Sequence, residues 1–228
     1  MANRTVLVTG ATRGIGRELV KQLCEQDFTV FATGRNQGLL ESLKEETGCL
    51  GVTCDLADAD ATVALYETAR AALGQIDVLV NNAGFNPGKD PLVDVTVDQI
   101  DASYAVNFRA CYLLAREALK KMSERKSGHI VNIVSTVAKT SLVDYSAYTA
   151  MKYALKGFTQ CLIKEAQRVN VKVTGVYPGG TDTDYREIDR PDYIRADSAA
   201  QMIVQCINAP DDLTVHDIIY RPMVETNF

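Results

Sequence analysis

The sequence predicts a doubly wound α/β domain around a mostly parallel sheet of about seven strands, and three observations support this fold class. Short apolar runs of strand length alternate with stretches of helical apolar periodicity along most of the 228 residues, as in repeated strand–helix–strand units. A glycine-rich segment follows the first apolar run. No repeat and no Pro-, Gly- and Ser-rich linker divides the chain, so we expect one domain over residues 1–228.

The first half of the chain predicts four strands. Apolar runs place them at residues 6–8, 29–32, 50–54 and 76–80. After each of the first three runs, apolar residues recur at intervals of three and four, which predicts a helix between consecutive strands. Strands joined through helices in this way pair in parallel.

The second half continues the alternation with longer helices. We expect a long helix over residues 97–123, a fifth strand at 130–134, a second long helix over 147–169 and a sixth strand at 171–176. The pattern weakens in a polar stretch over residues 181–197. A helix at 198–207 and a last strand at 217–220 complete the predicted domain.

Composition excludes several classes of partner. The 24 basic and 29 acidic residues give a net charge of −5 without a block of like charges, so neither nucleic acid nor an anionic membrane is expected as a partner. The six cysteines show no C-x-x-C spacing, so we expect no metal site and no redox pair. No stretch approaches the ~20 apolar residues of a membrane helix. The N-terminus has no signal-peptide pattern, and a cytoplasmic protein is the expectation.

The glycine-rich segment predicts a phosphate-binding turn. Gly10, Gly14 and Gly16 follow the first strand and open a helix. They permit a tight turn, bring the backbone close to phosphate oxygens and let the helix pack on the sheet. The N–H groups at the start of that helix would point at a dinucleotide pyrophosphate. An ordinary tight turn explains the same glycines about as well.

A second group of residues suggests proton transfer. Tyr148 and Lys152 are four residues apart, so on a helix they project from one face. A neighbouring ammonium stabilises a phenolate, which makes a tyrosine more useful as an acid or base near neutral pH. Ser135 follows the fifth strand, thirteen residues before Tyr148, and could donate to a substrate oxygen. Taken alone, a Tyr-x-x-x-Lys pair occurs by chance on many surface helices.

Together these motifs resemble the short-chain dehydrogenase/reductase family. Residues 9–16 have the family's TGxxxGxG spacing, residues 81–84 match its Asn-Asn-Ala-Gly motif, and Ser135, Tyr148 and Lys152 have its Ser–Tyr–Lys spacing. The resemblance covers nearly the whole chain and weakens after about residue 184. It implies a Rossmann fold and an oxidoreductase that transfers hydride between a nicotinamide cofactor and a carbonyl or alcohol group.

The resemblance implies a role for each catalytic residue. Ser135 and Tyr148 would polarise the carbonyl oxygen, and Tyr148 would protonate it. Lys152 would also bind the nicotinamide ribose. Asn107, in the first long helix, would hold a water that connects the site to solvent; a polar residue tolerated within the helix is the alternative for this position.

The resemblance also implies a cofactor-binding set. Its members are Gly10, Thr12, Arg13, Gly14, Ile15, Gly16, Arg35, Asp55, Leu56, Asn82, Ala83, Gly84, Tyr148, Lys152, Pro178, Gly179, Thr181 and Thr183. Asp55 would contact the adenine, and an N-terminal cap or first-turn acid of the following helix is the alternative. Thr181 stands where the family has Ile or Val, which leaves the contact to the carboxamide open.

The choice of cofactor depends on the end of the second strand. An acid there would bind the ribose hydroxyls of NAD, but this chain has Gly34 followed by Arg35. Arg13 lies in the glycine-rich segment on the same side, and two guanidiniums favour a 2′-phosphate. We therefore expect NADP(H). Solvated surface cations are the alternative interpretation of the two arginines.

The expected activity is NADPH-dependent reduction of a ketone or aldehyde to an alcohol. Three alternatives stay open: a 3-oxoacyl thioester reductase, an NAD-dependent alcohol or hydroxysteroid dehydrogenase, and a non-catalytic NADP-binding sensor. The sequence does not name the substrate. We expect its pocket to be lined by side chains of mixed polarity, namely Phe85, Asn86, Val137, Leu142, Asp144, Tyr145 and Tyr185. The short stretch between Thr183 and the next helix suggests an open pocket.

Two further features concern the remaining residues. His129 and His216 match no catalytic position, so both are expected to be structural. Residues 216–223 depart from the family's Asp-Gly-Gly ending, which commonly helps to form one of two tetramer contacts. We therefore expect a homodimer through the two long helices, or a homotetramer.

Overall fold

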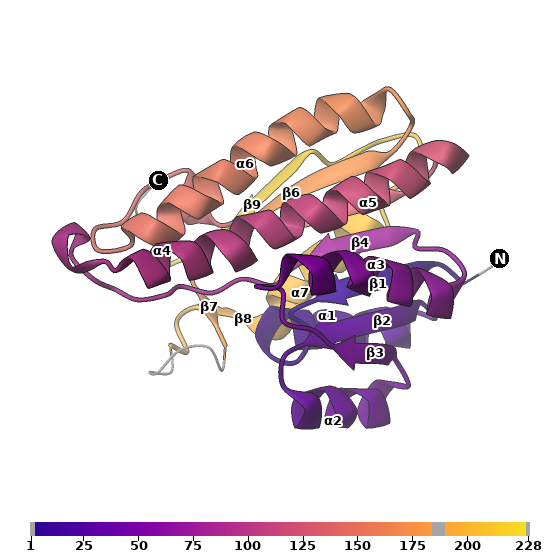
Figure 1. The fold of residues 1–228 in the computed structure, drawn as a ribbon, viewed down its shortest axis with the longest axis horizontal. Coiled ribbons are helices and arrows are strands. Elements are labelled where there is room, and N and C mark those ends of the chain that lie inside the picture. The colour runs from indigo at the N-terminus through magenta and orange to yellow at the C-terminus, as the bar shows by residue number, and fades with distance from the viewer. Residues whose placement is uncertain (1–2, 184–189, 227–228) are drawn as a thin grey trace.

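A computed structural model of the protein describes residues 3–183 and 190–226. Seven strands form one sheet in the order β3–β2–β1–β4–β5–β6–β9, and every neighbouring pair is parallel (Figure 1). The strands are β1 (Thr5–Thr9), β2 (Thr29–Gly34), β3 (Leu50–Thr53), β4 (Val78–Asn81), β5 (His129–Ile133), β6 (Lys172–Pro178) and β9 (Asp217–Tyr220). The predicted fold class is confirmed.

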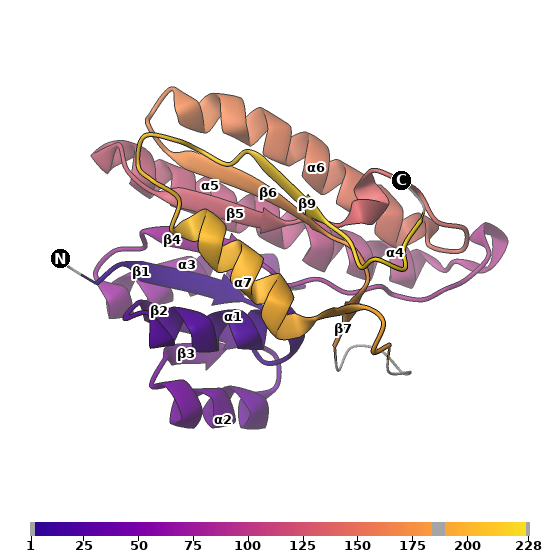
Figure 2. The same ribbon diagram turned by 180° about the vertical axis from the view of Figure 1, so that it is seen from behind.

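Helices cover both faces of the sheet. They are α1 (Gly14–Glu25), α2 (Gln37–Thr47), α3 (Ala59–Leu73), α4 (Val97–Tyr104), α5 (Ala110–Arg125), α6 (Ser146–Gln167) and α7 (Ala196–Ile207). Figures 1 and 2 show, from opposite sides, that α1, α2 and α7 pack on one face and α3, α5 and α6 on the other. Side chains of β1 alternate between the two faces of the sheet. Val6 and Val8 pack in the core under α1, α2 and α7, and Leu7 packs in the core under α3, α5 and α6.

The order of the strands creates a crevice at one edge of the sheet. β1 lies between β2 and β4, so the chain first builds the sheet on one side of β1 and then returns to its other side. All strands of a parallel sheet end at the same edge, and loops on the two sides of such a reversal lie apart from one another. None of the helices among the described residues is long and apolar enough to cross a membrane.

Two segments differ from the prediction. The helix expected over residues 97–123 is interrupted, because α4 ends at Tyr104, a π-helical turn spans Ala105–Arg109, and α5 begins at Ala110. No glycine or proline marks this interruption in the sequence. In the polar stretch, β7 (Thr181–Asp182) pairs with β8 (Ile194–Arg195), and two-residue strands are too short to show periodicity. The other predicted elements begin and end within two residues of the observed ones.

Candidate active site

A cleft of about 800 Å³ opens at the edge where the strands end. Every residue that the sequence assigns to the cofactor lines it, together with Ser135, Tyr148 and Lys152. Asn107 is fully buried and is not part of its lining. Of the side chains expected around the substrate, Phe85, Asn86, Val137, Leu142 and Tyr145 line the cleft, Asp144 does not, and Tyr185 lies outside the described residues.

The turn after β1 packs tightly on the segment after β4. Gly10 has φ +64°, and a Cβ on it would lie 2.7 Å from the Cα of Ala83. A Cβ on Gly16 would lie 2.2 Å from the carbonyl oxygen of Gly10. The amide of Asn82 donates to the carbonyls of Thr9 (2.9 Å) and Gly10 (3.1 Å). The glycines therefore bring bare backbone to the wall of the cleft.

The start of α1 provides hydrogen-bond donors to the same wall. α1 begins at Gly14, and Arg13 at the N-cap makes no side-chain bond to the helix. The N–H groups of the first turn lack a capping side chain, so they are suited to an anion. A Cβ on Gly14 would lie 3.2 Å from the Cβ of Thr183, so α1 directly faces the loop after β6. These features fit the pyrophosphate of a dinucleotide.

The end of β2 leaves no space for an acidic side chain. A Cβ on Gly34 would lie 2.5 Å from the Cγ2 of Thr12, and Thr12 is itself buried. Arg13 and Arg35 are exposed, and both line this end of the cleft. This end of the cleft therefore carries two cations, whereas binding the two ribose hydroxyls of NAD would need a carboxylate.

Asp55 lies after β3 and also lines the cleft. Its carboxylate accepts a hydrogen bond from the backbone N–H of Ala57 (3.0 Å). The side chain that caps α3 is Asp58, which accepts from the N–H of Ala61 (2.9 Å). The acid in the first turn of α3 is Asp60, so the alternative interpretation of Asp55 as a cap or first-turn acid of this helix is wrong.

Helix α6 places Tyr148 and Lys152 one turn apart in the cleft wall. Lys152 is 3% exposed, its Nζ donates to the carbonyl of Ile133 (2.9 Å), and Nζ lies 5.6 Å from the ring centroid of Tyr148. Burial lowers the pKa of Lys152 to about 8, and Cys111 opposes this shift. The ammonium still predominates at neutral pH, so its charge favours a phenolate beside it.

Ser135 lies directly after β5 and opens a short 3₁₀ turn, Thr136–Ala138. Its side-chain oxygen accepts a hydrogen bond from the backbone N–H of Val137 (3.2 Å). That bond fixes the oxygen and leaves the hydroxyl hydrogen for donation. The serine therefore suits a bound carbonyl oxygen as partner.

Asn107 lies in the π-helical turn and binds the chain after β4. Its Oδ1 accepts from the N–H of Phe85 (3.0 Å), and its Nδ2 donates to the carbonyl of Phe85 (2.8 Å) and to Ser103 Oγ (3.0 Å). A Cβ on Gly84 would lie 2.7 Å from Asn107 Oδ1 and 3.2 Å from Lys152 Nζ. The side chain of Asn107 thus holds the cleft wall at Phe85, a role that its position in the sequence did not predict.

Sequence reasoning missed several residues that line the cleft. Among them are Tyr193 and Glu225. Tyr193 and Glu225 belong to the part of the chain where apolar periodicity is weak, and no motif precedes them. They reach the cleft through the pairing of β7 with β8 and through the turn after β9, which are tertiary features.

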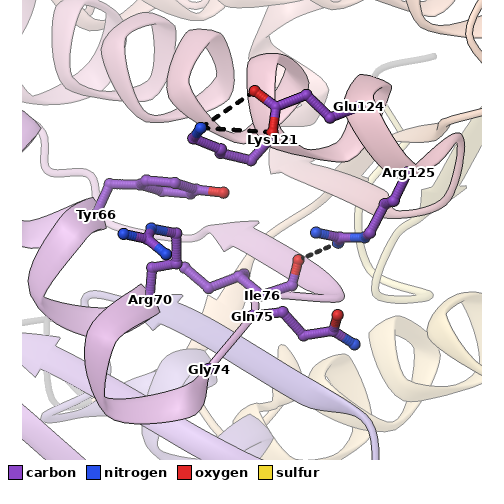
Figure 3. Close-up of a pocket in the computed structure, with 8 residues that line it drawn as sticks. All are labelled: Tyr66, Arg70, Gly74, Gln75, Ile76, Lys121, Glu124 and Arg125. Atoms are coloured by element: carbon purple, nitrogen blue, oxygen red, sulfur yellow. Dashed lines mark hydrogen bonds and ion pairs between the residues drawn. The ribbon is translucent and has the colours of Figure 1, made fainter.

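A second cavity, of about 270 Å³, lies between the C-terminal ends of α3 and α5 (Figure 3). Three cations line it: the hydroxyl of Tyr66 points toward Arg125, and Arg70 and Lys121 lie on either side of the tyrosine. Each cation is paired with an acid: Arg70 with Glu67, Lys121 with Glu124, and Arg125 with Asp77. The lining includes Ile76, just before β4 begins, so this cavity lies at the opposite edge of the sheet. With its charges paired, it is a poor candidate for binding an ion or a cofactor.

Known proteins are similar to this chain in sequence and in fold. The family profile described as short chain dehydrogenase matches residues 4–193. A protein of Mus musculus named dehydrogenase/reductase SDR family member 7B is 36% identical over 193 residues. The match covers 81% of this chain and 59% of the mouse protein, so the chain spans less than two thirds of that relative's length.

Solved structures agree in the fold. A metagenomic short-chain oxidoreductase in complex with NADP is 32% identical with a TM-score of 0.87, over 97% of this chain and 98% of that one. The closed form of a serine dehydrogenase complexed with NADP⁺ is 26% identical with a TM-score of 0.90, over 97% and 96% of the two chains. The profile match over most of the chain, together with the cleft described above, shows that the protein belongs to the short-chain dehydrogenase/reductase family of oxidoreductases.

Proposed function

We propose that the protein is an NADPH-dependent reductase that converts a ketone or aldehyde into an alcohol. The observation that supports this most is the content of one cleft, in which the glycine-rich turn and α1 lie with Ser135, Tyr148 and Lys152. The turn and the helix suit a dinucleotide, and the three side chains suit a carbonyl oxygen. A non-catalytic NADP-binding sensor would need the turn and the helix but not the three side chains.

The side chains divide the proton chemistry among them, and bound NADPH would supply the hydride. Ser135 donates a hydrogen bond to the substrate oxygen. Tyr148 gives its proton to the same oxygen, and the ammonium of Lys152 stabilises the phenolate that remains. Lys152 would also hold the nicotinamide ribose, and a water beside Asn107 would return the proton from solvent. The amide of Asn107 meanwhile fixes Phe85 in the cleft wall.

The preference for NADPH over NADH is supported by the end of β2. Thr12 fills the space beside Gly34 that an acidic side chain would need, and Arg13 and Arg35 line the same end of the cleft. We expect NADPH to bind at least about ten-fold more tightly than NADH, as two charge-assisted bonds to a phosphate would give. Fluorescence titration of the cofactor-free protein with each nucleotide measures this. Tighter binding of NADH would favour the NAD-dependent dehydrogenase instead.

The substrate is proposed to be an uncharged carbonyl compound. Of the side chains expected around the substrate, those that line the cleft are Phe85, Asn86, Val137, Leu142 and Tyr145, and all five are uncharged. Loss of nicotinamide absorbance with a panel of aldehydes, diketones and β-keto esters tests this class. A β-keto acyl-pantetheine substrate tests the thioester reductase alternative. Serine with NADP⁺ tests the oxidation after which the similar serine dehydrogenase is named.

Replacing Tyr148 tests the assignment of the acid. Tyr148→Phe should lower kcat by at least about 100-fold while the Kd for NADPH changes little, because the ring remains and the transferable proton is lost. Tyr153→Phe is the matched control, since Tyr153 is exposed on the same helix and does not line the cleft. Equal kcat values for the wild type and Tyr148→Phe would refute the assignment.

A further inference from the structure

We propose that Glu225 is a positioning residue of this cleft: its carboxylate, oriented by Arg221, holds the backbone of Gly180 in the loop after β6. This inference rests on the proposed function, since that loop is expected to hold the nicotinamide cofactor. Glu225 lies beyond the part of the chain that matches the family profile, which ends at residue 193. It nevertheless lines the same cleft as Tyr148 and Lys152.

Both oxygens of the Glu225 carboxylate have partners. The backbone N–H of Gly180 donates to Oε1 (2.7 Å), and Nη1 of Arg221 donates to Oε2 (3.3 Å). The side chains of Arg221 and Glu225 are 12% and 18% exposed, so solvent screens the pair less than it screens a surface ion pair. A carboxylate that accepts a short bond from a backbone N–H makes one of the stronger hydrogen bonds in proteins.

The turn after β9 brings the carboxylate to this position. The N–H of Gly179 donates to the carbonyl of Tyr220 (2.8 Å), which joins the end of β6 to the end of β9. The N–H of Glu225 then donates to the carbonyl of Pro222 (3.1 Å), and Pro222 is buried. The chain therefore reverses direction over the loop after β6, and the side chain of Glu225 points back at that loop.

The two consecutive glycines of the loop allow this close contact. A Cβ on Gly179 would lie 2.7 Å from Oε2 of Glu225, and a Cβ on Gly180 would lie 2.3 Å from a ring carbon of Tyr193. The carbonyl of Gly180 accepts from the N–H of Ile194 (3.0 Å). Gly180 is thus fixed from two sides, with Glu225 at its N–H and Tyr193 and Ile194 on the other side.

The position of Gly180 matters for the cofactor because the loop continues directly to the wall that faces α1. Thr183, three residues later, lies against Gly14, since a Cβ on Gly14 would be 3.2 Å from Thr183 Cβ. A Gly180 that lost its bond to Glu225 would let residues 181–183 move relative to α1. We therefore expect Glu225 to act on cofactor binding and not on proton transfer.

A titration of the full chain with NADPH tests the proposal without any turnover. Glu225→Ala should raise the Kd for NADPH about ten-fold, and Glu225→Gln, whose amide oxygen can still accept the N–H of Gly180, should raise it by no more than about three-fold. With a carbonyl substrate identified, the KM for NADPH should rise in Glu225→Ala while the KM for that substrate stays constant. Glu124→Ala is the control, because Glu124 also pairs with a cation but lies at the opposite edge of the sheet.

The outcomes separate this inference from the proposed function. If the wild type binds no NADPH and no NADH, the proposed function fails; if it binds either one and Glu225→Ala binds it equally well, the role of Glu225 fails. Equal weakening by Ala and Gln would also overturn the positioning role. If Glu225→Ala does not fold, Arg221→Met replaces it as the test. This substitution is made once in the wild type and once in the Glu225→Gln variant. The Arg221 substitution should then weaken binding in the first background and have little effect in the second, and equal effects would refute the proposed pairing.

Discussion

Lys152 is a buried cation that donates to the carbonyl oxygen of Ile133 and lies beside the ring of Tyr148. Burial lowers its pKa from 10.5 to about 8, so the folded protein binds this proton less readily than the unfolded chain does. At neutral pH the charge therefore destabilises the fold. The proposed chemistry explains why such a residue is present, because an ammonium is needed beside Tyr148.

We therefore predict opposite effects of Lys152→Met on activity and on stability. The substitution should abolish turnover, since the charge that stabilises the phenolate is lost. It should raise the free energy of unfolding of the cofactor-free protein by about 1–3 kcal/mol at pH 7, because methionine fills similar space without a charge. Urea denaturation measures the second effect. Lys156→Met, one turn further along α6, removes a lysine that is only partly buried and should retain activity.

The difference in stability between Lys152→Met and the wild type should depend on pH in a definite direction. Between about pH 8 and pH 10.5 the unfolded chain binds more protons at Lys152 than the folded protein does, so this residue makes the wild type more stable as the pH rises through that range. The advantage of Lys152→Met at pH 7 should therefore shrink by pH 10. A variant less stable than the wild type at pH 7, or a difference independent of pH, would contradict the argument.

Individual residues were predictable where a motif fixes their spacing. Gly10, Ser135, Tyr148 and Lys152 all line the same cleft, and each was named from the sequence. The role of Thr12 in filling the space at Gly34 was not predictable, because it depends on how two turns pack against each other. The same holds for Glu225, which reaches Gly180 over a separation of 45 residues.

Among the elements, β5, β6 and the segment before β9 are joined by a buried chain of hydrogen bonds. The hydroxyl of Thr174 donates to the carbonyl of Val215 (2.6 Å), so it must accept from Nε2 of His129 (2.8 Å). Nε2 of His129 therefore carries a proton. Burial lowers its pKa to about 3, and Arg4 and Lys172 act in the same direction. The histidine has a structural position, remote from the edge where the strands end.

This chain of bonds predicts a loss of stability in acid. The pKa of His129 falls from 6.5 in the unfolded chain to about 3 in the folded one, so its contribution is complete above about pH 6.5 and is lost as the pH falls toward 3. At pH 4.5 the wild type should have lost about 2 kcal/mol relative to His129→Gln, which does not titrate. Denaturation at pH 7 and pH 4.5 measures this. His216→Gln is the control, because His216 is exposed, and a similar acid effect there would contradict the assignment.

Elements were predictable from the sequence where periodicity extends over several turns or strands. Helices α6 and α7 and all seven strands of the main sheet lie within two residues of their predicted ends. The π-helical turn at Ala105–Arg109 was not predictable, because the sequence there contains no helix breaker and the turn coincides with the contact of Asn107 with Phe85. Local sequence does not encode such a partner.

At the scale of the whole molecule, the fold class followed from alternating strand and helix patterns, but periodicity cannot distinguish an apolar side chain in the core from one at an interface. The outer side of α4, α5 and α6 illustrates this. Tyr104 and Tyr112 are 42% and 44% exposed, yet both contact Phe108, and Tyr112 lies 4.6 Å from Phe158 between ring centroids. These helices run side by side in Figure 1, and the four rings form one aromatic cluster whose two tyrosines are exposed on that side.

An exposed aromatic surface of this kind is typical of a protein–protein interface, and we propose a homodimer through α4, α5 and α6. Sedimentation or light scattering should give about twice the 24.9 kDa mass of one chain. Tyr112→Asp should shift the protein to a monomer, because a carboxylate buried opposite a second copy of these rings would lack a partner. Leu213→Asp is the control, since Leu213 is 45% exposed in the loop after α7. A monomeric wild type, or a Tyr112→Asp variant that stays dimeric, would show that the two copies do not meet at this surface.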